Sequence, residues 1–355
     1  MRTIDFLDGK VVAVDQTLIP REFKTVELST VDEICGAIRR LAIRGAPAIG
    51  VAGAFGIIVG AANLPTKTTE EVFTHIEGLR RKLIGVRPTA INLKWAVDSI
   101  VEYAYSIKDL KYDAFLEKLT LRARRMADDE VRRAESLSAF GATLVPESGA
   151  RILTHCSTGP LCTVDYGLGM GAVYTAMKQG KKVHVFTDET RPRLQGAKIN
   201  TFDLKRMGIP FTLITDDSAA FVMKREKVDM LFISADRVAA NGDTAAKIGV
   251  YGLSIAAREH GIPVYVFCPM STIDYSTMRG DDIEIEERDA EEVLSINGDY
   301  IAPRDTPVLN YAFDITPARY INAIITDLGI VKPPFEANLA GLRKTFEEAL
   351  ENGAR

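Results

Sequence analysis

Cysteine is scarce in this sequence, and its spacing excludes two common uses of the residue. The chain has 355 residues and four cysteines, Cys35, Cys156, Cys162 and Cys268. They lie far apart except for one C-x5-C pair, which matches neither a disulfide framework nor a zinc knuckle. We therefore expect reduced thiols, which favour a cytoplasmic protein.

The sequence also lacks a long, uninterrupted apolar run. The most apolar stretch, 46–64, is broken by a proline and several glycines, which favours a buried helix over a membrane span. The first residues, MRTIDFLDGK, contain acidic side chains and no apolar core, so we do not expect a secretory signal. No membrane partner is predicted.

Neither sign of charge dominates. The net charge is −4, and charged residues make up 26% of the chain, which is ordinary for a globular protein. This argues against a nucleic-acid binder that relies on bulk positive charge. The arginine-rich run at 122–125 is followed by interleaved acids, which indicates a solvated helix face.

Several catalytic and cofactor motifs are missing. There is no Walker loop, no nucleophile elbow with a Ser-His-Asp order and no H-E-x-x-H. No G-x-G-x-x-G follows the first predicted strand of the C-terminal half, and no cysteine, histidine and acid spacing suits a metal site. We expect neither a metal nor an organic cofactor.

The patterns that are present predict an α/β protein. Short strands with a turn at Asp8-Gly9 precede a capping box at Thr30-x-x-Glu33 and a series of helices, including 68–86 and 113–139. After the boundary at 146–149, apolar strands alternate with helical segments at βαβ spacing. The strands are expected at 151–155, 183–186, 211–214, 230–233 and 264–267. We predict a smaller, mainly helical N-terminal domain preceded by short strands (1–147) and a C-terminal Rossmann-like, doubly wound parallel sheet (148–355).

The stretch from Met230 to Gly249 has the pattern of a ligand-facing sheet edge. A buried strand ends near Asp236, and Asn241-Gly242-Asp243 signals a turn. We expect Asp243 to cap a helix that begins near Thr244 and carries Lys247 in its first turns. The alternative is a structural Asp-Arg pair beside a turn. A second helix is expected after Thr316, with Pro317 at its first position.

Other chemistry-bearing residues also fall at predicted strand ends and helix starts. Cys156 follows the first strand of the C-terminal half, where a thiolate is favoured, although an inert buried cysteine is the alternative. Its neighbour His155 is expected to be a strand residue and not a base. Gln195-Gly196 opens a helix, and Arg44-Gly45 and Arg87 stand just before prolines that fit helix starts; a helix corner with a solvated arginine is the alternative. This set suits a phosphorylated small molecule that undergoes proton or hydride transfer.

Seven motifs carry a resemblance to a known family. The motifs are RGAPAIG (44–50), RPTAINLKWA (87–96), ILTHCSTG (152–159), DETRPRLQGA (188–197), ADRVAANGD (235–243), IEERD (285–289) and FDITP (313–317). With these motifs, the sequence resembles the methylthioribose-1-phosphate isomerases over nearly its whole length. The wider superfamily also holds ribose-1,5-bisphosphate isomerases, 5-deoxyribose-1-phosphate isomerases and the regulatory subunits of translation initiation factor 2B.

The resemblance implies an aldose–ketose isomerase of methionine salvage that converts 5-methylthioribose 1-phosphate to 5-methylthioribulose 1-phosphate. It also implies a homodimer that uses no metal or organic cofactor. Carried over residue by residue, Cys156 and Asp236 are catalytic, with Asp236 as the proton donor. The residues implied to bind the phosphorylated sugar are Arg44, Gly45, Ala46, Arg87, Gln195, Ala246 and Lys247.

Two departures from the family pattern border the expected pocket. The family usually has asparagine where this chain has Ala246, and asparagine or a small residue where it has Ser157. These changes leave 5-deoxyribose 1-phosphate and ribose 1,5-bisphosphate open as alternative substrates. A non-catalytic regulatory subunit of the initiation-factor type is the alternative from another functional class, but it has no need for Cys156 and Asp236 together at strand ends.

Overall fold

The computed structural model describes residues 2–65, 67–87 and 90–353. The chain forms two compact units, which are described separately. Unit 1 comprises residues 1–134 and 160–167, and unit 2 comprises residues 135–159 and 168–355. The predicted boundary at 147/148 does not coincide with this division, and it stays a prediction about where an independently folding domain would begin.

Unit 1 starts with a small antiparallel sheet. Strands β1 (Ile4–Leu7), β2 (Lys10–Val14) and β3 (Thr25–Leu28) pair in the order β1-β2-β3. The turn between β1 and β2 has positive φ at Asp8 (48°) and Gly9 (78°), as the aspartate-glycine pair predicts. The short N-terminal strands are therefore confirmed.

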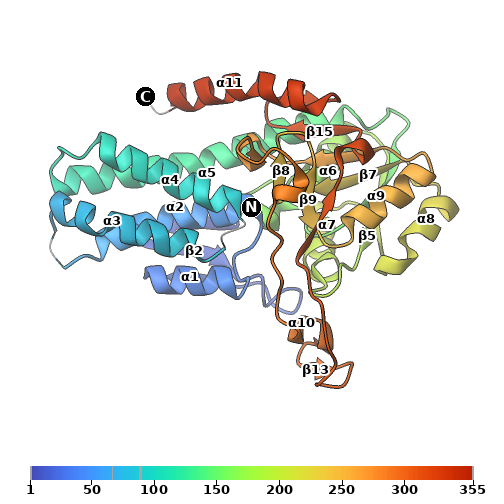
Figure 1. Ribbon diagram of the computed structural model, residues 1–355, viewed down its shortest axis with the longest axis horizontal. Coiled ribbons are helices and arrows are strands. Elements are labelled where there is room, and N and C mark those ends of the chain that lie inside the picture. Colours follow the sequence, from blue (N-terminus) through green and yellow to red (C-terminus); the bar gives the residue numbers. More distant parts are fainter. Residues whose placement is uncertain (1, 66, 88–89, 354–355) are drawn as a thin grey trace. The chain divides into compact units, whose positions relative to one another are not determined.

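Helices make up most of unit 1, as expected. They are α1 (Val31–Arg39), α2 (Ala46–Ala62), α3 (Thr69–Ile84), α4 (Ile91–Ser106) and the first part of α5 (Tyr112–Ala142). The predicted capping box is present, since the Thr30 hydroxyl accepts from the Glu33 N–H and the Glu33 carboxylate accepts from the Thr30 N–H. Figure 1 shows α2, α3 and α4 side by side at the blue end of the colour scale.

Glycines on α2 allow this buried helix to approach α4 closely. A Cβ at Gly50 would lie 3.0 Å from the carbonyl oxygen of Asn92, and one at Gly53 would lie 2.5 Å from the Leu93 side chain. Both helices therefore begin at the same end of unit 1. That end carries Arg44, just before α2, and Arg87, which precedes α4; Pro88, expected to open α4, lies outside the described residues.

The segment 160–167 packs into unit 1 although strand β4 (Ala150–Thr154) of unit 2 precedes it in the chain. The Thr3 N–H donates to the carbonyl oxygen of Val164 at 2.8 Å. The Gln16 amide donates to the carbonyl oxygen of Leu161 at 2.7 Å. Unit 1 is thus completed by residues that lie far beyond its first 134.

Unit 2 is built on a mainly parallel sheet with the strand order β16-β15-β10-β7-β4-β5-β6. All five strands predicted from the sequence are present: β4 (Ala150–Thr154), β5 (Val183–Asp188), β6 (Phe211–Ile214), β7 (Met230–Ser234) and β10 (Val264–Phe267). Two further strands, β15 (Ala323–Thr326) and the antiparallel β16 (Gly329–Val331), extend one edge. Read from β6 to β15, the order is that of a doubly wound Rossmann sheet, so the predicted fold class is confirmed.

Helices connect the strands from β4 to β10, which explains their parallel pairing. They are α6 (Gly169–Lys178), a π-helical turn at Gly196–Asn200 that continues into α7 (Thr201–Met207), α8 (Ala219–Arg225) and α9 (Val250–Glu259). The C-terminal helix α11 (Phe335–Gly353) follows β16. No helix among the described residues is long and apolar enough to cross a membrane.

One predicted helix is a strand instead, in a small sheet of order β11-β8-β9-β14, in which β11 spans Ile273–Asp274. The segment Thr244–Lys247 is β9, which pairs with β8 (Arg237–Ala239) and β14 (Phe313–Thr316). Asp243 does not cap a helix. Its carboxylate accepts from the N–H groups of Gly280 (3.0 Å) and Ala318 (2.8 Å), and the Asn-Gly-Asp turn closes the β8–β9 hairpin.

The helix expected after Thr316 is also absent from the described chain at that point. Thr316 ends β14 opposite Thr244, only a short 3-10 turn follows at Ala318–Tyr320, and β15 comes next. The residue before a proline is biased toward extended backbone, which suits a strand end. Between β11 (Ile273–Asp274) and β14 the chain leads away from the sheet, with α10 (Glu291–Leu294) and the hairpin β12–β13 (Ser295–Ile296, Asp299–Tyr300) near its tip (Figure 1).

Candidate functional site

The carboxyl ends of β4 and β7 form the topological switch point of the unit 2 sheet. The chain proceeds from β4 to β5 and β6 on one side, and from β7 to β10 and β15 on the other. Ligands bind in open α/β sheets at such a point. Thr154 on β4 pairs with Phe232 on β7, so Cys156 and Asp236 both lie just beyond the ends of neighbouring parallel strands.

Cys156 has a strained backbone held by hydrogen bonds. Its φ is +68°, which is unusual for a residue with a side chain. The Cys156 N–H donates to the hydroxyl of Thr190 at 3.0 Å, and that hydroxyl donates to the carbonyl oxygen of Asp188 at 3.2 Å. The half-buried thiol accepts from the Gln195 amide, with 3.5 Å between Nε2 and Sγ. Two residues predicted for the site therefore meet.

A close backbone approach fixes the start of the Gln195 helix. A Cβ at Gly196 would lie 1.7 Å from the carbonyl oxygen of Asp188, so only glycine fits beside the end of β5. The loop before it is held by Asp216, whose carboxylate accepts from the N–H groups of Thr190 (2.7 Å) and Arg191 (2.6 Å). Gln195 is therefore fixed by the loop that precedes it, which Asp216 holds, and by the close packing of Gly196, which follows it.

Asp236 lies next to the β8–β9 hairpin. Its N–H donates to the carbonyl oxygen of Ala245 at 2.9 Å, and its side chain is partly exposed. The neighbouring Arg237 has its own carboxylate partner, Asp274, at 3.6 Å. Arg237 therefore pairs with a carboxylate outside the stretch from Met230 to Gly249.

Ala246 and Lys247 lie on β9 and not on a helix. Ala246 is completely buried and pairs with Asp314 on β14. The Lys247 ammonium donates to the carbonyl oxygen of Ala312 at 2.7 Å and lies 4.4 Å from the ring centroid of Phe313. These contacts direct the lysine along β14.

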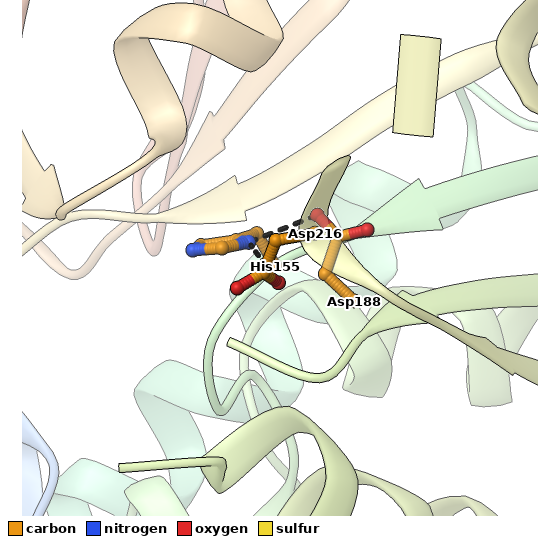
Figure 2. A group of neighbouring side chains, drawn as sticks. All are labelled: His155, Asp188 and Asp216. Atoms are coloured by element: carbon orange, nitrogen blue, oxygen red, sulfur yellow. Dashed lines mark hydrogen bonds and ion pairs between the residues drawn. The ribbon is translucent and has the colours of Figure 1, made fainter. Parts of the chain in front are cut away.

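A buried cluster that the sequence analysis did not assign lies beside Cys156 (Figure 2). His155 Nδ1 lies 2.9 Å from Asp188 Oδ2 and 4.0 Å from Asp216 Oδ1, and Nε2 lies 3.0 Å from the carbonyl oxygen of Ile248. Burial disfavours the imidazolium, but the hydrogen bond and charge of Asp188 outweigh it and raise the pKa of His155. Burial also raises the pKa of Asp188, with His155 acting in the opposite direction.

The three side chains of this cluster have ligand-type atoms within 4.8 Å of one another. Hydrogen bonds already engage most of them, since His155 Nδ1 faces Asp188 and both oxygens of Asp216 accept backbone N–H groups. A metal would have to displace these bonds. The cluster is better described as a hydrogen-bond network.

Buried polar atoms without a hydrogen-bond partner gather at this sheet edge. Burying such a group without a partner costs about 1–3 kcal/mol, so a group of them suits a place that ordered water or a polar ligand fills. Among the described residues, those at the ends of β4, β5 and β7 or in the loops that follow are Ser157 Oγ, Asp188 Oδ1, Gln195 Oε1 and Ser234 Oγ.

The remaining predicted site residues belong to unit 1. Gly45 precedes α2 with φ +96°, and a Cβ there would lie 2.0 Å from the carbonyl oxygen of Cys162. Arg44, Ala46 and Arg87 are partly exposed. A helix start with an arginine on each of two neighbouring segments suits an anion such as a phosphate. The structure thus groups four predicted residues in unit 1 and five in unit 2.

Comparison with known proteins places the chain among close relatives. The initiation factor 2 subunit family matches residues 42–333. Methylthioribose-1-phosphate isomerase 2 of Pseudothermotoga lettingae is 45% identical over 98% of this chain and 99% of its own length. Methylthioribose-1-phosphate isomerase of Geobacter sulfurreducens is 44% identical over 96% and 98%, respectively. The resemblance drawn from the seven motifs is confirmed.

Solved structures give the same result. The crystal structure of 5-methylthioribose 1-phosphate isomerase from Pyrococcus horikoshii is 42% identical, with a TM-score of 0.89 over 97% of this chain and 96% of that one. A structure described as translation initiation factor eIF-2B, subunit delta, from A. fulgidus is 36% identical, with a TM-score of 0.84 over 97% and 99%. The same fold therefore occurs in a protein described as an isomerase and in one described as an initiation-factor subunit.

Proposed function

The chain belongs to the initiation factor 2 subunit family, and from this premise we propose that it isomerises 5-methylthioribose 1-phosphate to 5-methylthioribulose 1-phosphate. This is an aldose–ketose isomerisation of methionine salvage. The observation that carries the proposal is the identity of 45% to a methylthioribose-1-phosphate isomerase across 98% of the chain. The unit 2 site supplies groups suited to such a reaction.

Asp236 acts as the acid that opens the sugar ring. An aldose with a phosphate on its anomeric oxygen has no free hydroxyl there, so the ring oxygen must be protonated before the ring opens. A positioned carboxylic acid can contribute about 10²–10⁴-fold to such a step. The place of Asp236 beyond β7, with its backbone tied to Ala245, supports this role.

Cys156 serves the transfer of hydrogen from C2 to C1. Either it removes the C2 proton through an enediolate, or it stabilises the transition state of a direct hydride shift. Its position beyond β4 and the Gln195 amide directed at its sulfur support both versions. Gln195 retains a buried Oε1 that can accept from a sugar hydroxyl.

The remaining residues bind the substrate. Arg44 and Arg87, with the N–H groups at Gly45 and Ala46, provide cationic and dipolar contacts for the phosphate. Lys247 is the third cation proposed to bind the substrate, and Ala246 contributes backbone contacts only. Holding the phosphate fixes the sugar in register and prevents loss of the phosphate during the reaction.

The identity of the C5 substituent is the open part of the substrate proposal. 5-Methylthioribose 1-phosphate is the first candidate because of the names of the relatives. 5-Deoxyribose 1-phosphate and ribose 1,5-bisphosphate are the alternatives, because Ala246 and Ser157 differ from the usual family pattern.

We also propose a homodimer in the cytoplasm. The four cysteines all lie in the described part of the chain and are free, which agrees with a reducing compartment. Gel filtration with light scattering of the pure protein tests the oligomeric state.

The second candidate function is a non-catalytic initiation-factor-type subunit. It is kept because a structure described as such a subunit is 36% identical over 97% of this chain. A subunit of this kind would turn over no sugar phosphate and would assemble with other chains.

The test is isomerase activity on 5-methylthioribose 1-phosphate and 5-deoxyribose 1-phosphate side by side. We expect strong turnover of the first, with losses of about 10²-fold or more in Cys156→Ser and Asp236→Asn. Cys35→Ser, in a buried position on α1, and Asp217→Asn, on an exposed loop, serve as matched controls. A preference for 5-deoxyribose 1-phosphate would keep the proposed reaction type but change the pathway assigned to the enzyme. No turnover of either sugar would favour the regulatory subunit.

A further inference from the structure

His155 and Asp188 form a buried titratable pair that the proposed reaction does not use. His155 follows β4 and is 2% exposed, and Asp188 ends β5 and is fully buried. Figure 2 shows the imidazole edge directed at the carboxylates of Asp188 and Asp216. A buried ionisable pair is costly unless it is well hydrogen-bonded, so its presence beside Cys156 needs an explanation.

Both ring nitrogens of His155 face hydrogen-bond acceptors. Nδ1 lies 2.9 Å from the Asp188 carboxylate, and Nε2 lies 3.0 Å from the carbonyl oxygen of Ile248. A carbonyl oxygen only accepts, so Nε2 must carry a hydrogen, and the contact at Nδ1 needs a second one. The pair therefore holds two protons, either as imidazolium and carboxylate or with the second proton on Asp188. A neutral imidazole beside an ionised carboxylate would hold only one.

The ring connects two segments that carry proposed site residues. On one side, Cys156 is the next residue in the chain, and its N–H is held through Thr190 by the carbonyl oxygen of Asp188. On the other side, Ile248 directly follows Lys247. The lack of a side chain at Gly249 leaves room for the His155 ring, because a Cβ there would lie 3.3 Å from Nε2 and Cε1.

We propose that His155 is a positioning residue, held by Asp188 in a pair that carries two protons, and that it fixes the segment carrying Cys156 relative to the segment carrying Lys247. The link to catalysis rests on the proposed isomerase function, whereas the protonation state of the ring does not. His155 touches neither the sugar nor the phosphate in this scheme. It acts through the two residues that do.

The surrounding charges favour the second proton. The carboxylates of Asp188 and Asp216 raise the pKa of His155, the charges of Asp314 and a protonated ring also attract each other, and Lys247 is the cation on the adjoining strand. Asp188→Asn removes the nearest of these charges with little change in shape. As the pH rises, the ring of that variant loses its second proton and keeps only the hydrogen on Nε2. The new amide must then turn so that its NH2 group donates to Nδ1, and this neutral hydrogen bond is weaker than the charge-assisted bond to Asp188.

The first experiment compares kcat and KM between pH 6 and pH 9 for the wild type, Asp188→Asn, His155→Gln and the control His184→Gln. His184 lies on the same strand as Asp188 but bonds the Thr212 hydroxyl outside the network. We expect kcat of Asp188→Asn to fall about tenfold or more below the wild type at pH 9 and to recover toward pH 6, with a nearly unchanged KM. A wild-type kcat for Asp188→Asn at every pH overturns the proposal, as does a wild-type kcat for His155→Gln.

The second experiment does not depend on turnover or on variants that fold poorly. The chain has four histidines, so ¹⁵N labelling of their rings gives a simple spectrum for the full-length protein. We expect the wild type at pH 8.5 to keep the hydrogen on His155 Nε2 and to hold the second proton on Nδ1 or between Nδ1 and Asp188. An Nε2 without a hydrogen, or an Nδ1 that neither carries nor shares one, overturns the proposal. If the wild type turns over neither sugar, the proposed function fails. The alkylation rate of the Cys156 thiol then tests the positioning role. If His155 positions Cys156, this rate should change in Asp188→Asn and stay at the wild-type value in His184→Gln.

Discussion

Substituting Gly196 by alanine (Gly196→Ala) should disturb the site, because the added methyl group has no room beside the end of β5. The added Cβ would lie 1.7 Å from the carbonyl oxygen of Asp188 and 2.7 Å from the Thr190 hydroxyl, whereas real Cβ contacts rarely fall below 3.0 Å. The carbonyl belongs to the buried end of β5 and cannot rotate away. Relief therefore requires a backbone shift of more than 1 Å, or partial shifts on both sides.

Such a shift reaches the proposed reaction centre by two routes. Gln195, whose amide bonds the Cys156 sulfur, precedes the substituted residue, and Thr190 holds the Cys156 N–H. A displacement of about 1 Å in a reacting group can cost about 10²-fold in rate. Overpacking of this kind also costs about 1–3 kcal/mol of stability, or about 2–4 °C in melting temperature for each kcal/mol in a domain of 150–250 residues.

The matched control is Gly252→Ala on α9, where a Cβ meets nothing within 4 Å. Alanine in a helix is favoured over glycine by about 0.5–1 kcal/mol, so this variant should be slightly more stable and fully active. Thermal melts and steady-state kinetics of both variants provide the test. If Gly196→Ala melts and turns over like the wild type, the close approach does not hold the site as argued.

Three further predictions follow from other contacts. Lys247→Met should raise KM by about tenfold or more through loss of a charged hydrogen bond, whereas Lys224→Met on the exposed face of α8 should not; equal KM values would contradict the role of Lys247. Exhaustive dialysis against EDTA should leave kcat unchanged, because hydrogen bonds occupy the His155 cluster; a loss restored by added metal would contradict this. Asp274→Asn should lower the melting temperature at pH 7. Burial alone would raise the pKa of Asp274, but hydrogen bonds from nearby hydroxyls and the charge of Arg237 lower it below the ordinary 3.8. Its stabilising effect is therefore present above that pH and is lost as the pH falls through the folded value, so melts near pH 3 should show a smaller difference between variant and wild type than melts at pH 7.

The sheet of unit 2 was predictable because its strands have a clear local pattern. Each of the five predicted strands is a short apolar run after a turn, and buried parallel strands have this pattern whatever their neighbours. The places of Cys156, Gln195 and Asp236 followed from the same rule, since residues after such strands gather at one edge.

The predictions of a helix from Thr244 and of a helix after Thr316 were wrong for a physical reason. Thr244–Lys247 has the sequence TAAK, which favours a helix, and Asn-Gly-Asp serves equally as a hairpin turn or as the start of a helix. The choice between them depends on pairing with β14, some 70 residues away, and no local pattern carries that information.

The His155 cluster was missed because its members are far apart in the sequence. Asp188 and Asp216 end or follow neighbouring strands β5 and β6, and His155 follows β4, which pairs with β5. A signal existed, since each strand end carries a titratable residue. No local pattern excluded a simple helix cap for Asp216 or an ordinary strand position for His155.

The return of residues 160–167 to unit 1 has a consequence for the order of synthesis. Unit 1 cannot be complete when its first 134 residues have left the ribosome, because the carbonyl oxygens that hold Thr3 and Gln16 are still to come. About 30 more residues, including the whole of β4, must be made first, which takes about 2–6 seconds at 5–20 residues per second. The helices of unit 1 therefore cannot complete their packing until β4 of unit 2 has been synthesised. Expressing residues 1–134 alone would leave unit 1 without residues 160–167.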